Sequence, residues 1–234
     1  MISIKKPVLT IAVVIVLSVF AKIGTATAQE RTAKPDTTDS DAKSSLSFAI
    51  QPMFMLNNAG KIDVEWQPAG TKLGYIFTAE VYSGRIKDVK AVFDNPSDIP
   101  WDRVNGAGIG IAQKYKFKDE RSSPYLAYGL TYRYQEISIE TEGFFTYEQD
   151  GLTYYDYGPL EKNLVVSSGL ATAVFGYQKI SDDFLYDFYF GFGYKAQFNN
   201  TEFEGLRSYD NSIVNYAYKG FGMVAGFKIG YQFR

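Results

Sequence analysis

The feature that most constrains the fold is a repeated alternation of large apolar residues with glycine and charged residues. Between residues 186 and 195, one set of alternate positions holds five aromatic rings: Tyr186, Phe188, Phe190, Phe192 and Tyr194. The positions between them hold Asp187, Tyr189, Gly191, Gly193 and Lys195. Successive side chains of a strand point to opposite faces, so this period of two predicts a strand with one aromatic face. No segment after residue 45 has the 3.6-residue period of a helix.

The same alternation recurs along the chain and predicts eight strands. They fall at residues 48–56, 61–66, 73–81, 107–117, 127–135, 164–178, 186–195 and 220–233. Pro52 predicts an irregularity in the first strand, because proline is confined to strand edges, starts or bulges. For residues 164–178, the sequence does not decide which alternate residues share a face. A bulge near Val174 and Phe175 would explain the change in pattern.

The connections between these strands alternate in length. Those at residues 68–71, 119–124 and 181–183 are short, whereas those at 84–105, 140–163 and 199–214 are longer, and only 57–60 departs from the rule. Chains that weave through an outer membrane have short turns at one end and long loops at the other. The pattern therefore favours an up-and-down order of strands.

The glycine and charged face of these strands indicates which face points inward and which points outward. A sandwich core built from its glycines would be full of voids, and a Lys or Arg facing lipid near the midplane would cost roughly 2–4 kcal/mol. We therefore predict that the aromatic face meets lipid and the glycine and charged face fills the interior. An open sheet edge is not viable in hydrocarbon, so the strands close into an eight-stranded antiparallel transmembrane β-barrel. The predicted interior charge network is Asp63, Glu65, Glu80, Lys114, Arg133, Asp187, Lys195 and Lys228.

The start of the chain has the composition of a signal peptide. Lys5 and Lys6 precede an apolar run that ends before Lys22, shorter than the roughly 20 residues that span a bilayer, so a signal peptide is favoured over the alternative of a single anchoring helix. Small residues at Ala26 and Ala28 match a cleavage pattern. We predict a signal peptide at residues 1–28, a disordered periplasmic tail at residues 29–45 and the barrel at residues 46–234.

Composition excludes several kinds of chemistry. The chain has no His and no Cys, which excludes imidazole bases, thiolate nucleophiles, disulfides and Cys/His zinc sites. Its net charge of −2 does not suggest nucleic-acid binding. The glycines at positions 106, 108 and 110 lie within an alternating strand, so they do not form a nucleotide loop. We predict no catalytic residue, no cofactor and no metal ligand.

The loop at residues 140–163 is the candidate surface site. Asp150-Gly151 suits a tight hairpin turn, so the flanking strands are expected to continue beyond the membrane as a two-stranded ribbon. Its rings could bind a partner protein, its acidic residues could contact a divalent cation shared with lipopolysaccharide, or the rings could simply pack on one another. The candidate contact residues are Phe144, Phe145, Tyr147, Tyr154, Tyr155 and Tyr157.

The chain resembles the small outer-membrane β-barrels of Gram-negative bacteria, namely the OmpA-type transmembrane barrel and the OmpX/Ail group. The most specific piece is the last strand, which resembles the alternating aromatic signal read by the barrel-assembly machinery. Its signal residues are Phe227, Ile229, Tyr231 and Phe233. That signal usually ends on an aromatic residue, and here Arg234 follows. The resemblance implies an outer-membrane location, periplasmic termini, contact with lipid and lipopolysaccharide, and a monomer.

The resulting functional prediction is a non-enzymatic protein of the cell envelope, because the small outer-membrane enzymes of this kind depend on histidine. Its role would be structural or adhesin-like, through the outer loops. Two alternatives stay open, a narrow porin-like channel for small solutes and a soluble lipocalin-like carrier in the periplasm. Paired interior charges would form a plug, whereas hydrated ones would line a channel.

Overall fold

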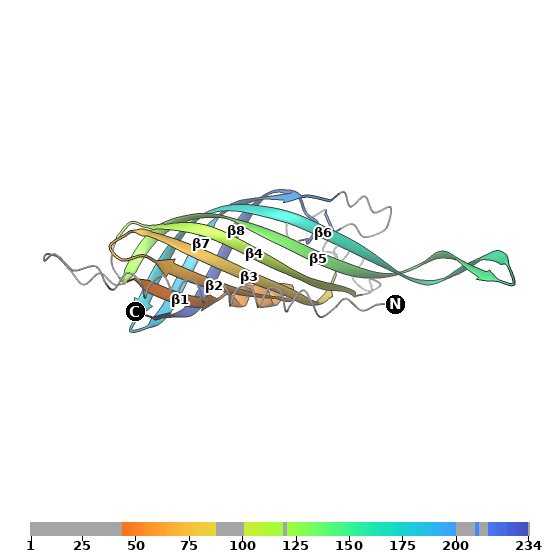
Figure 1. Ribbon diagram of the computed structural model, residues 1–234, viewed down its shortest axis with the longest axis horizontal. Coiled ribbons are helices and arrows are strands. Elements are labelled where there is room, and N and C mark those ends of the chain that lie inside the picture. Colours follow the sequence, from red (N-terminus) through yellow and green to blue (C-terminus); the bar gives the residue numbers. More distant parts are fainter. Residues whose placement is uncertain (1–43, 88–100, 119–120, 200–208, 211–214, 234) are drawn as a thin grey trace, which may run out of the picture. The chain divides into compact units, whose positions relative to one another are not determined.

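A computed structural model describes residues 44–87, 101–118, 121–199, 209–210 and 215–233. The predicted signal peptide and residues 29–43 of the predicted tail lie outside this part of the chain, as does Arg234. Within it, eight antiparallel strands form one sheet that closes in the order β1 to β8 (Figure 1). The strands are β1 (Ser45–Ile50), β2 (Ala59–Gln67), β3 (Leu73–Ile86), β4 (Asp102–Lys116), β5 (Ser122–Gln149), β6 (Leu152–Ser181), β7 (Phe184–Gln197) and β8 (Gly220–Phe233). The predicted all-β class and the eight antiparallel strands are confirmed.

The first strand is shorter than predicted. It begins at Ser45, which pairs with Gln67 and so belongs to the sheet rather than to the predicted tail. It ends at Ile50, and Pro52 then starts a 3-10 helix, η2 (Pro52–Asn57). Proline suits this position because its fixed φ and missing N–H are tolerated in a first helical turn. Asn58 ends the helix in the left-handed region, with a φ of 51°.

Strand β1 is the weak closure of the barrel wall. It pairs with β8 over only five residues, from Leu46 opposite Phe233 to Ile50 opposite Ile229. By contrast, β7 pairs with β8 from Phe184 to Lys195. Among the described strands, none pairs with the other edge of β8 at residues 220–228. Met53 of η2 lies at this edge, where it borders an apolar groove together with Phe190 and Phe227.

Strands β5 and β6 form a hairpin that continues well past the rest of the sheet (Figure 1). Strand β4 pairs with β5 only as far as Ser138, whereas β5 and β6 stay paired up to Gln149 and Leu152. Asp150 and Gly151 have φ values of 53° and 76°, as a two-residue type I′ turn requires. The predicted ribbon is therefore confirmed. The pairing of β6 runs without a break, so the bulge considered near Val174 is absent.

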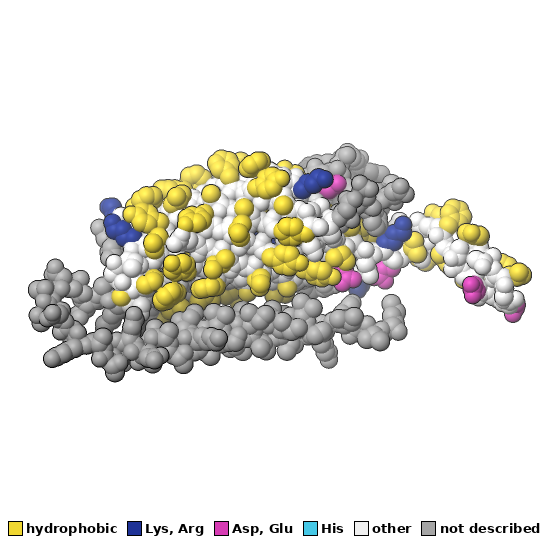
Figure 2. Space-filling view, turned by 45° about the horizontal axis from the view of Figure 1, so that its top comes forward, with side chains coloured by type: hydrophobic (Ala, Val, Ile, Leu, Met, Phe, Trp, Pro, Cys, Tyr) yellow, Lys and Arg dark blue, Asp and Glu magenta, His cyan; other side chains and the backbone are white. Residues whose placement is uncertain are grey.

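The aromatic face of the strands points away from the barrel interior. On β7, Phe190 is 64% exposed and Phe192 67%, while Asp187 on the opposite face of the same strand is 1% exposed. On the face seen in Figure 2, hydrophobic side chains cover the strands, and charged side chains lie toward the ends. No helix in the described part of the chain is both long and apolar enough to cross a membrane.

Candidate functional site

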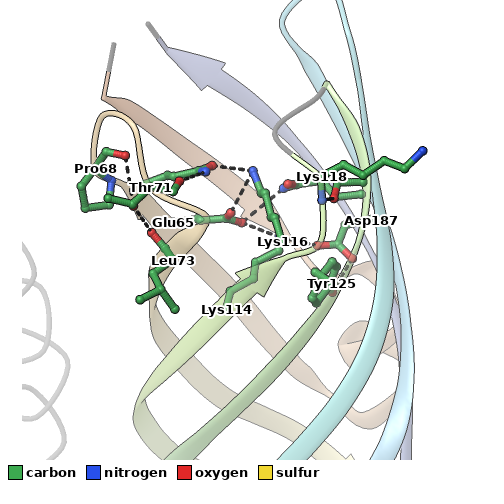
Figure 3. A network of polar contacts seen from close by, with 12 residues as sticks. Glu65, Pro68, Thr71, Leu73, Lys114, Lys116, Lys118, Tyr125 and Asp187 are labelled. Atoms are coloured by element: carbon green, nitrogen blue, oxygen red, sulfur yellow. Dashed lines mark hydrogen bonds and ion pairs between the residues drawn. The ribbon is translucent and has the colours of Figure 1, made fainter. Parts of the chain in front are cut away.

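The barrel interior near the tight turns holds a buried charge group centred on Lys114 (Figure 3). Its Nζ lies 2.8 Å from Glu65 Oε2 and 3.3 Å from Asp187 Oδ2. The three side chains come from β4, β2 and β7, which are not neighbours in the sheet, and at most a tenth of each is exposed. These ion pairs therefore cross the interior rather than run along its wall.

Neighbouring side chains satisfy the rest of this group. The hydroxyl of Tyr125 donates to Asp187 Oδ1 at 2.6 Å, and Gln178 Nε2 donates to Glu65 Oε2 at 3.2 Å. The Nζ of Lys116 donates to Gln67 Oε1 at 2.7 Å and lies 3.7 Å from Glu65 Oε1. Such partners matter because a buried charge without compensating contacts is costly.

A second charge group surrounds Glu80, farther from the tight turns. Arg133 donates to both carboxylate oxygens, from Nε at 2.7 Å and from Nη2 at 3.0 Å. Lys61 Nζ lies 3.3 Å from Oε1, and the Tyr82 hydroxyl donates to Oε2 at 2.7 Å. The two-pronged Arg133 contact fixes the carboxylate in direction as well as in place.

The third group joins Asp63 to Lys228, with Nζ 2.6 Å from Oδ2. Thr78 donates to the other carboxylate oxygen at 2.6 Å, and Gln51 Nε2 donates to Oδ2 at 2.7 Å. The hydroxyl of Tyr189 in turn donates to Gln51 Oε1 at 2.5 Å. Gln51 is the last residue before η2, so the 3-10 helix is anchored to the interior through its side chain.

Seven of the eight predicted interior charges lie in these three groups, which we call the charged zone. The eighth, Lys195, instead donates to the backbone carbonyl of Tyr216. Lys61 and Lys116 belong to the zone, but the predicted network omitted them. The alternation did contain the signal, since Lys61 has the same phase as Asp63 and Lys116 the same phase as Lys114.

Inward-facing glycines make room for the inward-facing tyrosines. A Cβ at Gly176 would lie 2.3 Å from Tyr125 Cζ, and one at Gly226 would lie 2.3 Å from Tyr189 Oη. No real Cβ tolerates such a distance. Each tyrosine thus has a glycine on the adjacent strand, which leaves room for its ring. The Tyr125 hydroxyl can then reach Asp187, and the Tyr189 hydroxyl can reach Gln51.

Toward the ribbon, the interior holds a mainly apolar cluster beside the buried Asp102, which the sequence analysis did not predict. This cluster, here called the apolar cap, lies above Glu80. Its strand residues are Ala59, Tyr82, Ile86, Val104, Ile137, Ile139, Leu164 and Val166, and Tyr209 and Ala217 join it from the last connection. Val104, Ile137 and Val166 are fully buried.

The ribbon carries the six predicted surface rings on its two faces. Phe144 lies opposite Tyr157 with ring centroids 5.1 Å apart, and Tyr147 stacks on Tyr154 at 5.4 Å. Phe145 lies beside Tyr147, and Tyr155 is 78% exposed. Four of the six rings thus pair across the strands, and Phe144, Tyr147, Tyr154, Tyr155 and Tyr157 remain exposed. Residues 140–161 contain six acidic residues and no Lys or Arg.

The four predicted assembly-signal residues share the outward face of β8. Phe227 stacks on Phe188 with centroids 5.2 Å apart, while Tyr231 packs against both Phe184 and Phe233. Ile229 lies opposite Ile50 at the end of the β1 pairing. These contacts place an aromatic band beside the tight turns.

Comparison of the chain with models of protein families and with curated proteins found no match. Within the described residues, no three acidic side chains are grouped so that they could hold a metal ion.

Proposed function

We propose that the protein is a non-enzymatic integral β-barrel of the outer membrane of a Gram-negative bacterium, with a structural or surface-interaction role. The observation that carries the proposal is the distribution of side chains on the wall. Large apolar rings point outward along the strands, and ion pairs are buried inside. A protein stable in water would have the opposite distribution, because large exposed apolar surfaces associate or aggregate.

The hydrogen bonding of the sheet supports the same proposal. Each backbone N–H and C=O left unpaired in hydrocarbon costs several kcal/mol, which closure of the sheet largely avoids. Rings such as Trp66, Tyr115 and Tyr231 lie near the tight turns, as expected of an interfacial aromatic girdle. In this arrangement the tight turns and both termini of the chain would face the periplasm, and the ribbon would face outward.

Biogenesis and contacts follow from this placement. Residues 1–28 would direct export, and the β8 residues Phe227 to Phe233 would be read by the barrel-assembly machinery. The outward rings would contact lipid, and the acidic ribbon would meet lipopolysaccharide or a surface protein. We propose a monomer, because the sheet closes on itself between β1 and β8 without a second chain.

The interior is better suited to a plug than to a channel. The pairs of Lys114 with Glu65 and Asp187 cross the lumen at one level, and Arg133 with Glu80 occupies the next. An eight-stranded barrel leaves an interior just wide enough for side chains. We therefore expect no steady current from the protein in planar bilayers. A selective current that changes in Arg133→Ala would favour the channel instead.

The membrane proposal is tested by one substitution at two places. Phe190→Arg puts a charge where we expect the hydrocarbon, and should weaken folding into bilayers by about 2–4 kcal/mol. Tyr155→Arg puts the same charge on the ribbon and should change folding by less than about 0.5 kcal/mol. Urea titration into lipid vesicles measures both. Equal effects, or release of the parent protein from membranes by a carbonate wash, would favour the soluble carrier.

A further inference from the structure

A cavity lies in the middle of the barrel interior, between the charge groups already described. Its volume is about 110 Å³, and its polar lining includes Lys61, Asp63, Arg133 and Lys228. One buried water needs roughly 10–15 Å³ measured in this way, so the cavity can hold a small ion with part of its hydration. It borders the outward-facing groove at Met53, because Tyr189 and Ala225 line both spaces, and the cations lie on its inner side.

The charges around this cavity do not balance. Lys228 pairs with Asp63, but Lys61 and Arg133 share one carboxylate, that of Glu80. Three cations thus face two carboxylates. Buried charge without a counter-charge is strongly disfavoured, so a site of this composition favours one additional negative charge.

The hydrogen-bond donors show the same surplus. A guanidinium has five N–H donors, of which Arg133 directs two to Glu80, and an ammonium has three. Glu80 is the only carboxylate of the described residues that pairs with either Lys61 or Arg133. Both side chains therefore keep donors for another acceptor in the cavity that they line.

The remaining lining sets the class of anion. Ile76, Leu170, Val174 and Val224 contribute apolar surface beside the cations. An anion loses its hydration on entering such a space, and the loss is smallest for a weakly hydrated one. We propose that the cavity binds a small, weakly hydrated monovalent anion, such as bromide or chloride, held by Lys61 and Arg133. This site goes beyond the proposed function and does not depend on whether the wall faces lipid.

A heavy halide locates the site directly. Crystals of the full-length folded protein are soaked in sodium bromide, and anomalous scattering is recorded at the bromine edge. The expected result is a peak inside the barrel, within hydrogen-bond distance of Lys61 Nζ and the Arg133 guanidinium. Bromide found only on the outer surface of the protein would overturn the proposal.

A solution measurement tests the role of the surplus cation. Thermal unfolding is followed in sodium bromide and in sodium sulfate at equal ionic strength, since a ligand that binds only the folded state raises its stability. Lys61→Met removes one cation and leaves Glu80 paired with Arg133, so the variant should fold. Its apparent affinity for bromide should fall about tenfold or more, the loss expected for one charged contact.

Lys116→Met is the matched control, because Lys116 is a buried interior cation that does not line the cavity. It should keep the bromide dependence of the parent. If bromide stabilises Lys61→Met as strongly as the parent, or if sulfate and bromide act alike on the parent, the proposal is wrong.

Discussion

The two halves of the barrel interior are built on the same strands but by different chemistry. Toward the tight turns, the charged zone consists of ion pairs that cross the lumen, with tyrosines laid over glycines. Toward the ribbon, the apolar cap is mainly aliphatic, with side chains such as Val104, Ile137 and Val166, and its two tyrosines each donate to a carboxylate. The change occurs within single strands, since β5 places Arg133 in the zone and Ile137 in the cap.

This difference teaches that strand alternation fixes the face of a side chain but not the polarity of that face. A narrow interior can be filled mainly by paired charges or by packed hydrocarbon. The charged zone and the apolar cap should therefore respond differently to substitution. Charges depend on the presence of every partner, whereas hydrocarbon depends on volume.

The largest effect is expected from a charge-only change in the charged zone. Glu80→Gln keeps the shape of the side chain but leaves Lys61 and Arg133 without their shared carboxylate. We expect a loss of roughly 3–5 kcal/mol in the free energy of unfolding, as when one partner of a buried ion pair is removed. Urea titration measures this loss, and Glu148→Gln on the exposed ribbon is the control. A loss below 1 kcal/mol (about fivefold in the unfolding equilibrium) would mean that water already screens the group.

The apolar cap should instead respond in proportion to volume. Ile137→Val removes one methylene and should cost about 0.5–1.5 kcal/mol, and Ile137→Ala about 2–4 kcal/mol. The same titration gives both values. If Ile137→Val cost as much as Glu80→Gln, the distinction between the two halves would fail.

The sequence predicted the wall of this molecule better than its interior. Alternation on β4, β5, β7 and β8 was unambiguous because rings or large aliphatic side chains alternate there with glycine, small or charged residues. It also predicted the ribbon, because Asp150-Gly151 favours one turn type. Pro52 signalled an irregularity, but the 3-10 helix that it starts depends on Gln51 reaching Asp63 and Tyr189, which are remote in sequence.

The apolar cap could not be predicted from the same rule. On β6 the inward positions hold Leu164, Val166 and Leu170, while the outward ones include Ser167 and Gly169, so polarity reverses within one strand. Ile86 and Val104 lie in a stretch that was interpreted as loop. Pairing with neighbours fixes their direction, and a single strand contains no information about that pairing. Lys195 is a similar case, because its partner is a backbone carbonyl in the last connection.

A smaller effect should separate steric from electrostatic needs inside the charged zone. Gly176→Ala places a Cβ against the ring of Tyr125, whose hydroxyl must still reach Asp187. We expect a loss of about 1–3 kcal/mol, the usual cost of overpacking. In Tyr125→Leu the added methyl group should cost much less, so the double-mutant cycle should show coupling. Additive losses would mean that Gly176 is required by the local backbone and not to make room for the Tyr125 ring.

The smallest effect on the barrel should come from the largest deletion. Removing residues 141–148 and 153–160 leaves Gln149-Asp150-Gly151-Leu152 as a turn directly above the pair of Glu140 and Glu161. The deletion takes out equal numbers from both strands, so register and phase are kept, and all six surface rings are lost. An isolated two-stranded ribbon is marginally stable by itself, so its loss should change unfolding of the barrel by less than about 0.5 kcal/mol. The same variant should lose adhesion of whole cells to protein-coated surfaces if the ribbon is the contact site. A deletion that destabilises the barrel by more than about 1.5 kcal/mol would instead show that the ribbon is part of its folding unit, in the same class as the cap beneath it.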